Sequence, residues 1–273
     1  MKNVLPLLLF FAFLTACCKE KAIPIPEIAD PKRRVLVEEL TGVKCTQCPG
    51  GARILIALQD STFGKENLIV ISNHSAGNFS IPYSDSKDDF RSSDAQTMAD
   101  YIGSTLGFPT ASINRIVPAN TQSPFTLASK WAGLINAEFS KDFGLELFVN
   151  TQFNPTSRQL DIEVLMDPTT QTLAGENRLS VVITQDSIRD PQLDNGVKIK
   201  DYLHRHVLRA AVTSPTGDVI AEPLTVGILR KRNYTFNLPT KWEAKHCSVV
   251  AFVHHGGNPD KDVLQATEVH VVK

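Results

Sequence analysis

The chain lacks several features that define whole classes of protein. It carries 28 Lys and Arg residues against 29 Asp and Glu residues, a net charge of −1, and like charges form no long block. Nucleic-acid binders need a basic surface, so neither DNA nor RNA is an expected partner. Five cysteines are too few for a disulfide scaffold, and no apolar run reaches the about 20 residues of a membrane-spanning helix. With 42% hydrophobic residues among 273, the chain can bury sizeable cores, and its length favours two domains.

The first residues have the pattern of an export signal. A short positive start, Met1–Asn3, precedes an almost wholly apolar run from Val4 to Leu14 that is too short to span a bilayer. The run ends in Thr15-Ala16-Cys17, which resembles the lipobox of bacterial lipoproteins, where cleavage precedes a cysteine that becomes lipidated. We therefore expect residues 1–16 to be a lipoprotein signal peptide, Cys17 to be the lipidation site and residues 17–32 to be a lipidated tether. An ordinary secretory signal with incidental cysteines is the alternative.

Residues 33–140 alternate between strand-like and helix-like segments. Helices between strands indicate an α/β domain whose mixed or parallel sheet is covered on both faces. Strands are predicted at Val35–Val37, Leu68–Ile71 and Thr110–Ile113, and helices are predicted from Pro49 onward, over Ser93–Gly103 and from Ser123-Pro124 to about Phe139.

The sequence Cys45-Thr46-Gln47-Cys48 stands where the first strand gives way to the first helix. Two thiols at this spacing can close a small disulfide ring, and the amides at a helix start stabilise a thiolate on Cys45. This is the chemistry of thiol–disulfide exchange. A structural zinc site is the alternative, but it needs about four ligands, and the sequence places no second CxxC or His pair nearby. We therefore expect neither a metal nor another cofactor.

The arrangement of the CxxC sequence between strand and helix resembles the thioredoxin superfamily. The resemblance implies a nucleophile at Cys45 and a resolving thiol at Cys48. It also implies a buried proton-relaying acid at Glu39 and a cis proline beside the dithiol at Pro109. Lys44 departs from this pattern, because thioredoxins carry Trp before the first cysteine. A purely structural Cys45–Cys48 disulfide, a solvated Glu39 and a trans Pro109 are the alternatives.

From Lys141 onward the pattern changes to alternating polar and apolar residues. Such runs, separated by turn clusters, predict an antiparallel β-sandwich (Ig-like) over residues 141–273. The runs are Leu145–Val149, Leu160–Val164, Leu179–Thr184, His206–Val212, Tyr234–Leu238, Val249–Val253 and Val263–Val272. His204 and His206 share a strand face if that strand begins early enough, but ordinary polar positions are the simpler interpretation. Cys247 is unpaired and is expected to pack as a small apolar residue.

Several stretches of the mature chain together resemble the outer-membrane-protein-28 family of lipoproteins from Bacteroidota. They are Glu38–Gly42 leading into Cys45–Pro49, Gly107–Thr110, Tyr202–Arg209, Val249–Val253 and Val263–Ala266. The resemblance implies an outer-membrane lipoprotein with a thioredoxin-like N-terminal half and a β-sandwich C-terminal half.

Two functions are compatible with these features. The favoured hypothesis is a surface-facing outer-membrane lipoprotein that binds a protein or glycan ligand, with Cys45–Cys48 as a structural disulfide. A membrane-anchored thiol–disulfide oxidoreductase is the alternative, since the spacing of a CxxC does not reveal its activity. The cell surface is the expected location, and the periplasmic face of the membrane is the alternative.

Overall fold

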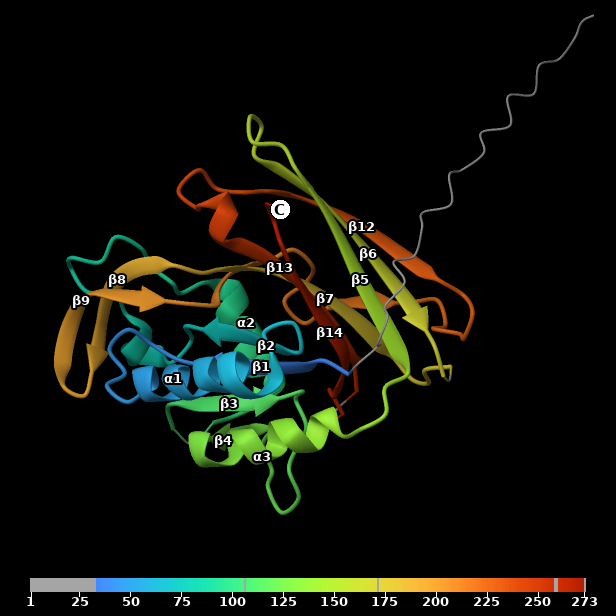
Figure 1. Ribbon diagram of the computed structural model, residues 1–273, viewed down its shortest axis with the longest axis horizontal. Helices are drawn as coiled ribbons and strands as arrows, with labels where there is room; N and C mark the ends of the chain where they lie inside the picture. The colour runs from blue at the N-terminus through green and yellow to red at the C-terminus, as the bar shows by residue number, and fades with distance from the viewer. Residues whose placement is uncertain (1–32, 106, 171, 258–259, 273) are drawn as a thin grey trace, which may run out of the picture.

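The computed structural model describes residues 33–105, 107–170, 172–257 and 260–272 (Figure 1). The expected signal peptide, Cys17 and the tether lie outside the described residues. No helix in the described ranges is long and apolar enough to cross a membrane.

A mixed sheet of nine strands runs through the described part of the chain (Figure 1). β1 lies between β2, to which it is parallel, and β3, to which it is antiparallel. The strand order is β14 (Val263–His270), β13 (Cys247–His255), β7 (Asn177–Gln185), β10 (Val207–Ala211), β2 (Leu68–Asn73), β1 (Val35–Leu40), β3 (Thr110–Ile113) and β4 (Phe125–Leu127), with β11 (Asp218–Ile220) beside β7. The predicted strands of both halves are therefore confirmed, and strands from both halves share this sheet, whereas the predicted runs at Leu145–Val149, Leu160–Val164 and Tyr234–Leu238 lie in a second sheet.

Three helices cover the part of the sheet around β1. The odd residues of β1, such as Val37, pack with Leu55 of α1 (Cys48–Leu58) and Trp131 of α3 (Ala128–Phe139). The even residue Leu36 packs with Met98 of α2 (Ser93–Ile102) on the opposite face. A π-helical turn, Gln59–Phe63, ends α1, and a 3-10 turn lies at Gly77–Ser80. Because successive side chains of β1 point to opposite faces of the sheet, they pack alternately against α1 and α3 or against α2.

The C-terminal strands are covered by a smaller antiparallel sheet. It consists of β5 (Leu145–Phe153), β6 (Gln159–Pro168) and β12 (Arg230–Asn237). Its apolar residues, including Leu147 and Val164, share a core with Val181 and Val249 of the large sheet. The remaining hairpin, β8 (Ile188–Asp194) and β9 (Val197–His204), extends toward α1 (Figure 1).

Three details differ from the sequence predictions. The helix expected from Ser123-Pro124 begins only at Ala128, because the buried Phe125 and its neighbours pair with β3 as an edge strand. An Ig-like sandwich is not confirmed, because Val207 of β10 pairs in parallel with Ser72 and so joins the C-terminal strands to the α/β sheet. The β8–β9 hairpin was not predicted.

Candidate functional site

The two cysteines lie where β1 gives way to α1. Cys45 and Cys48 are joined by a disulfide bond, and Cys48 is the first residue of α1. Pro49 follows in the first turn, where its missing N–H leaves no intrahelical hydrogen bond unmade. Cys45 is 5% exposed and Cys48 1%, so an incoming thiol or thiolate reaches Cys45 more readily. After reduction, the amides at the start of α1 stabilise a thiolate at this end of the helix.

Glu39 lies near the end of β1 and is only 1% exposed, so the alternative of a solvated side chain is wrong. Its Oε2 accepts a hydrogen bond of 3.1 Å from the Ser72 hydroxyl on β2. Its Oε1 is buried without a hydrogen-bond partner among the described residues. Burial raises the pKa of Glu39 to about 8, and the Ser72 hydrogen bond opposes this shift only in part. The carboxyl group therefore holds a proton at neutral pH that it can release slightly above it.

Close packing at Gly51 brings the acid, α1 and Pro109 together. The Phe108–Pro109 peptide bond is cis and directly precedes β3, so the trans alternative is wrong. A Cβ atom on Gly51 would lie 2.9 Å from the Cβ of Pro109 and 3.1 Å from Oε1 of Glu39, which leaves no room for a side chain. Glycine at this position thus allows the first turn of α1 to approach both residues.

The β8–β9 hairpin is docked on the loop that carries the cysteines. Its turn residues Asn195 and Gly196 have φ angles of 47° and 82°, as a tight hairpin turn requires. Backbone and side-chain amides of the hairpin donate hydrogen bonds of 2.7 to 3.2 Å to the loop. They are Leu193 to the Val43 carbonyl, Asn195 to the Thr46 carbonyl, Gly196 to the Thr46 hydroxyl and Gln192 to the Gly42 carbonyl. The C-terminal half therefore fixes the backbone between Cys45 and Cys48.

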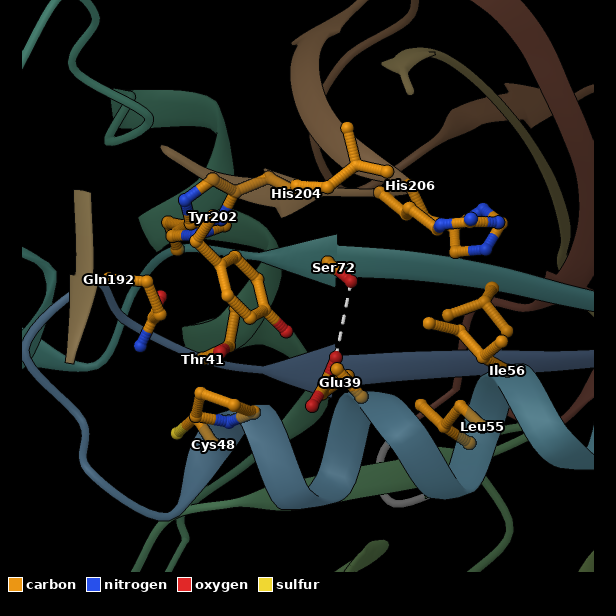
Figure 2. Close-up of a pocket in the computed structure, with 16 residues that line it drawn as sticks. Glu39, Thr41, Cys48, Leu55, Ile56, Ser72, Gln192, Tyr202, His204 and His206 are labelled. Atoms are coloured by element: carbon orange, nitrogen blue, oxygen red, sulfur yellow. Dashed lines mark hydrogen bonds between the residues drawn. The ribbon is translucent and has the colours of Figure 1, made fainter. Parts of the chain in front are cut away.

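A small cavity lies between α1, β1 and β9 (Figure 2). Glu39 and Cys48 both line it, and Tyr202 and His204 line it from the hairpin side. Its volume of about 40 Å³ has room for water but not for an organic ligand. The carboxyl group and the second cysteine therefore share one small cavity.

A second, larger groove opens beside Cys45. It has a volume of about 450 Å³ and a largely apolar lining that includes Phe79 and Phe108, whose ring centres are 6.1 Å apart. Phe79 is 49% exposed. Cys45 therefore lies in the lining of this groove, whereas Cys48 lines the smaller cavity.

The histidines singled out in the sequence, His204 and His206, both line the small cavity but do not lie on one strand. His204 is buried, and burial lowers its pKa to about 4; burial likewise lowers the pKa of the neighbouring His74 to about 3. His206 has a φ of 54° and lies between the end of β9 at His204 and the start of β10 at Val207, so the condition for a shared strand face is not met. His254 is buried and hydrogen-bonded to Ser180. Within the described ranges, no three His, Cys, Asp or Glu side chains are grouped to hold a metal ion.

Cys247 is buried in the core between the two sheets. Burial raises the pKa of its thiol to about 12, so the reactive thiolate is scarce at neutral pH. The prediction that Cys247 packs as an apolar residue is confirmed.

Sequence reasoning missed Gly51, Gln192 and Tyr202. The signal for Gly51 was the pair Gly50-Gly51 in the first turn of a helix, where glycine is otherwise unfavourable. The signal for the hairpin residues was Asp194-Asn195-Gly196, because Asn-Gly is typical of a tight β-hairpin turn.

Comparison with known proteins gives one family and several related structures. The sequence model of a family described as "Outer membrane protein Omp28" matches residues 95–273, more than half of the chain. No curated protein matches the sequence. HBP35 of Porphyromonas gingivalis is similar in structure, with a TM-score of 0.69 and 19% identity over 89% of this chain and 76% of that chain. A protein of Agrobacterium tumefaciens is similar with a TM-score of 0.55 and 9% identity over 90% of this chain and 97% of that chain. At these identities the likeness shows a shared fold.

Proposed function

Since the chain belongs to the Omp28 family and is an outer-membrane lipoprotein, we propose that it carries out thiol–disulfide exchange on envelope proteins at that membrane. Cys45 is the nucleophile, Cys48 the resolving thiol, and Glu39 the group that moves protons. Pro109 shapes the groove on the Cys45 side. Residues 33–140 are a thioredoxin-like domain in this proposal, and residues 141–273 are a β-sandwich domain added to its sheet.

One observation carries the proposal: a buried carboxyl group with a pKa of about 8 shares a small cavity with Cys48. A structural disulfide has no use for such a group, because an unpaired buried acid lowers stability once it ionises. Proton transfer near neutral pH is efficient when the acid titrates near the working pH. Perturbed carboxyl groups of this kind are typical of reactive sites.

The exchange proceeds in two steps. The Cys45 thiolate attacks one sulfur of a substrate disulfide, forms a mixed disulfide and releases the other substrate sulfur as a thiolate. Cys48 then gives its proton to the ionised Glu39 and attacks the Cys45 sulfur, which re-forms the Cys45–Cys48 bond and releases the second substrate thiolate. The dithiol loses two electrons and the substrate disulfide gains them. In the reverse direction Glu39 protonates the departing Cys48 thiolate.

The test is a trapping experiment in intact cells. Cys48→Ser removes the resolving thiol, so mixed disulfides between Cys45 and envelope proteins should accumulate and disappear on reduction. Cys45→Ser should trap nothing, and Cys247→Ser is the control for a thiol outside the site. If Cys48→Ser traps nothing and only lowers stability, thiol exchange is not the function.

The expected binding or adhesion function remains the second candidate. The docked hairpin favours it, because hydrogen bonds to the cysteine loop hold the disulfide as a fixed part of the structure. The reduction potential separates the two functions. A structural disulfide is expected below about −300 mV, whereas a catalytic pair lies well above that value.

The anchor and its orientation are also part of the proposal. Metabolic labelling with a fatty-acid probe should mark the wild type and not Cys17→Ser, because the thiol is the attachment point. Equal labelling would place the anchor elsewhere. Protease added to intact cells should cleave the protein if it faces outward. Protection until the outer membrane is lysed would indicate the periplasmic face.

A further inference from the structure

Tyr202 lies on β9, in the hairpin that covers the cavity between Glu39 and Cys48. Figure 2 shows its hydroxyl pointing toward the Glu39 carboxyl group. Burial raises the pKa of Tyr202, and the negative charge of Glu39 raises it further. The phenol therefore stays protonated at neutral pH and can donate one hydrogen bond while it accepts another.

Glu39 lacks a polar partner on this side. Ser72 satisfies Oε2, but Oε1 is buried and has no hydrogen-bond partner in the described part of the chain. An unpaired buried oxygen disfavours ionisation of the carboxyl group. The cavity of about 40 Å³ is large enough for water that connects Oε1 with the Tyr202 hydroxyl.

We propose that Tyr202 is a positioning residue for proton exchange at Glu39, linking the carboxyl group through cavity water to solvent at the hairpin. This inference rests on the proposed function and deepens it. After Glu39 has taken the proton of Cys48 and the Cys45–Cys48 bond has re-formed, the carboxyl group passes that proton to water held by Tyr202. The ionised Glu39 is then ready for the next cycle. The C-terminal half of the chain thus completes a site whose cysteines belong to the N-terminal half.

Other titratable or charged groups surround the same cavity. Burial holds His74 and His204 in the neutral form above about pH 4. Arg205, after β9, and His206, which lies beside Asp186, line the cavity as well. Arg53 of α1, which is paired with Asp194, does not line it but acts on Tyr202 through its charge. His206 lines the same cavity as Glu39, so a variant at this position serves as a control.

The test compares the full-length wild type with Tyr202→Phe, which removes only the hydroxyl. A mixed disulfide of Cys45 with glutathione is formed by rapid mixing, and its resolution by Cys48 is followed from about pH 6 to about pH 10. The wild-type rate should rise with an inflection near the Glu39 pKa of about 8. Tyr202→Phe should lower the plateau rate about tenfold and move the inflection to higher pH, because a hydrogen bond to a charged group is lost.

Two matched variants control the comparison. Tyr83→Phe removes a hydroxyl from a ring that packs beneath Lys198 of the same hairpin, and His206→Gln removes an imidazole that lines the cavity. Both should keep the wild-type inflection. Identical profiles for the wild type and Tyr202→Phe overturn the role of Tyr202 and leave the proposed function standing.

A second measurement separates this inference from the proposed function. If the wild type forms no mixed disulfide, the proposed function fails, but infrared titration of the Glu39 carboxyl band in the reduced protein still measures its pKa. Glu39→Gln assigns the band. A higher pKa in Tyr202→Phe supports the coupling to Tyr202, and an unchanged pKa overturns it.

Discussion

The two faces of β1 bury neighbouring glutamates in opposite ways. Glu38 faces Arg115, whose Nε and Nη2 donate two hydrogen bonds of 2.7 Å to its carboxylate, and the ring of Phe252 stacks on the guanidinium group. Glu39 receives one hydrogen bond, from Ser72, and opens onto the cavity beside Cys48. The same residue type is thus ion-paired on one face, and on the other it is a buried acid with a raised pKa, to which we assign proton transfer in the proposed function. The partner supplied by the fold decides between these roles.

The largest expected effect on stability comes from breaking the ion pair between Glu38 and Arg115. Glu38→Gln leaves the Arg115 guanidinium buried without a countercharge, so the free energy of unfolding should fall by about 3–5 kcal/mol. Denaturant titration measures this loss. Asp194→Asn, which breaks the more exposed pair with Arg53, is the control and should change stability by less than about 1 kcal/mol. Equal effects of the two variants would contradict the structural role of Glu38.

On the other face, removal of the acid should stabilise the protein, and only at high pH. Glu39 has a pKa of about 8 in the folded chain and about 4.5 when unfolded, so the folded state holds an extra proton between these values. Stability from this group is complete below about pH 4.5 and is lost as pH rises through 8. Glu39→Gln should therefore gain roughly 2–3 kcal/mol at pH 9 relative to wild type and little at pH 5. A gain of the same size at both values would show that ionisation is not the cause.

Alternation in the sequence predicts that Glu38 and Glu39 point to opposite faces, but not what each face contains. Arg115 meets Glu38 because Asn114 and Arg115 turn the chain with φ angles of 46° and 57° directly after β3. A strand pattern carries no information on that turn. The roles of the two carboxyl groups therefore became clear only from tertiary packing.

The sequence pattern likewise predicts the strands and helices but not how they pair. Periodicity predicts the strands on both sides of residue 140, and the helix start at Cys48 follows from the CxxC-Pro sequence. Which strands pair is not encoded in such runs, so the contact of β10 with β2 was missed. Docking of the hairpin on Thr46 joins residues 150 positions apart, which no local signal specifies.

The two buried histidines on the Glu39 side of β1, His74 and His204, should make the protein less stable at acidic pH. The folded pKa of His74 is about 3 and that of His204 about 4, against 6.5 when unfolded, so the unfolded chain binds protons first as pH falls. Their stabilising contribution is complete above about pH 6.5 and is lost progressively below it. His74→Phe should reduce the loss of stability between pH 6.5 and pH 4 by about 2 kcal/mol. His246→Gln changes a more exposed histidine and should leave this loss of stability unchanged. If both variants reduce the loss equally, other groups cause it.

The smallest expected effect on stability concerns two serines, each of which is the cross-strand neighbour of one of the glutamates. Ser72 is the cross-strand neighbour of Glu39 and donates a hydrogen bond to it, whereas Ser112 is the neighbour of Glu38 and its buried hydroxyl makes no hydrogen bond in the described structure. Ser72→Ala should cost about 1 kcal/mol and raise the pKa of Glu39 further, because the hydrogen bond favours the ionised form. The cost should be larger at pH 9 than at pH 6, since a hydrogen bond to a carboxylate is stronger than one to a neutral acid. Ser112→Ala should show no such pH dependence in the same denaturant titrations. If both variants behave alike, the Ser72 hydroxyl does not tune the acid, and desolvation alone sets its pKa.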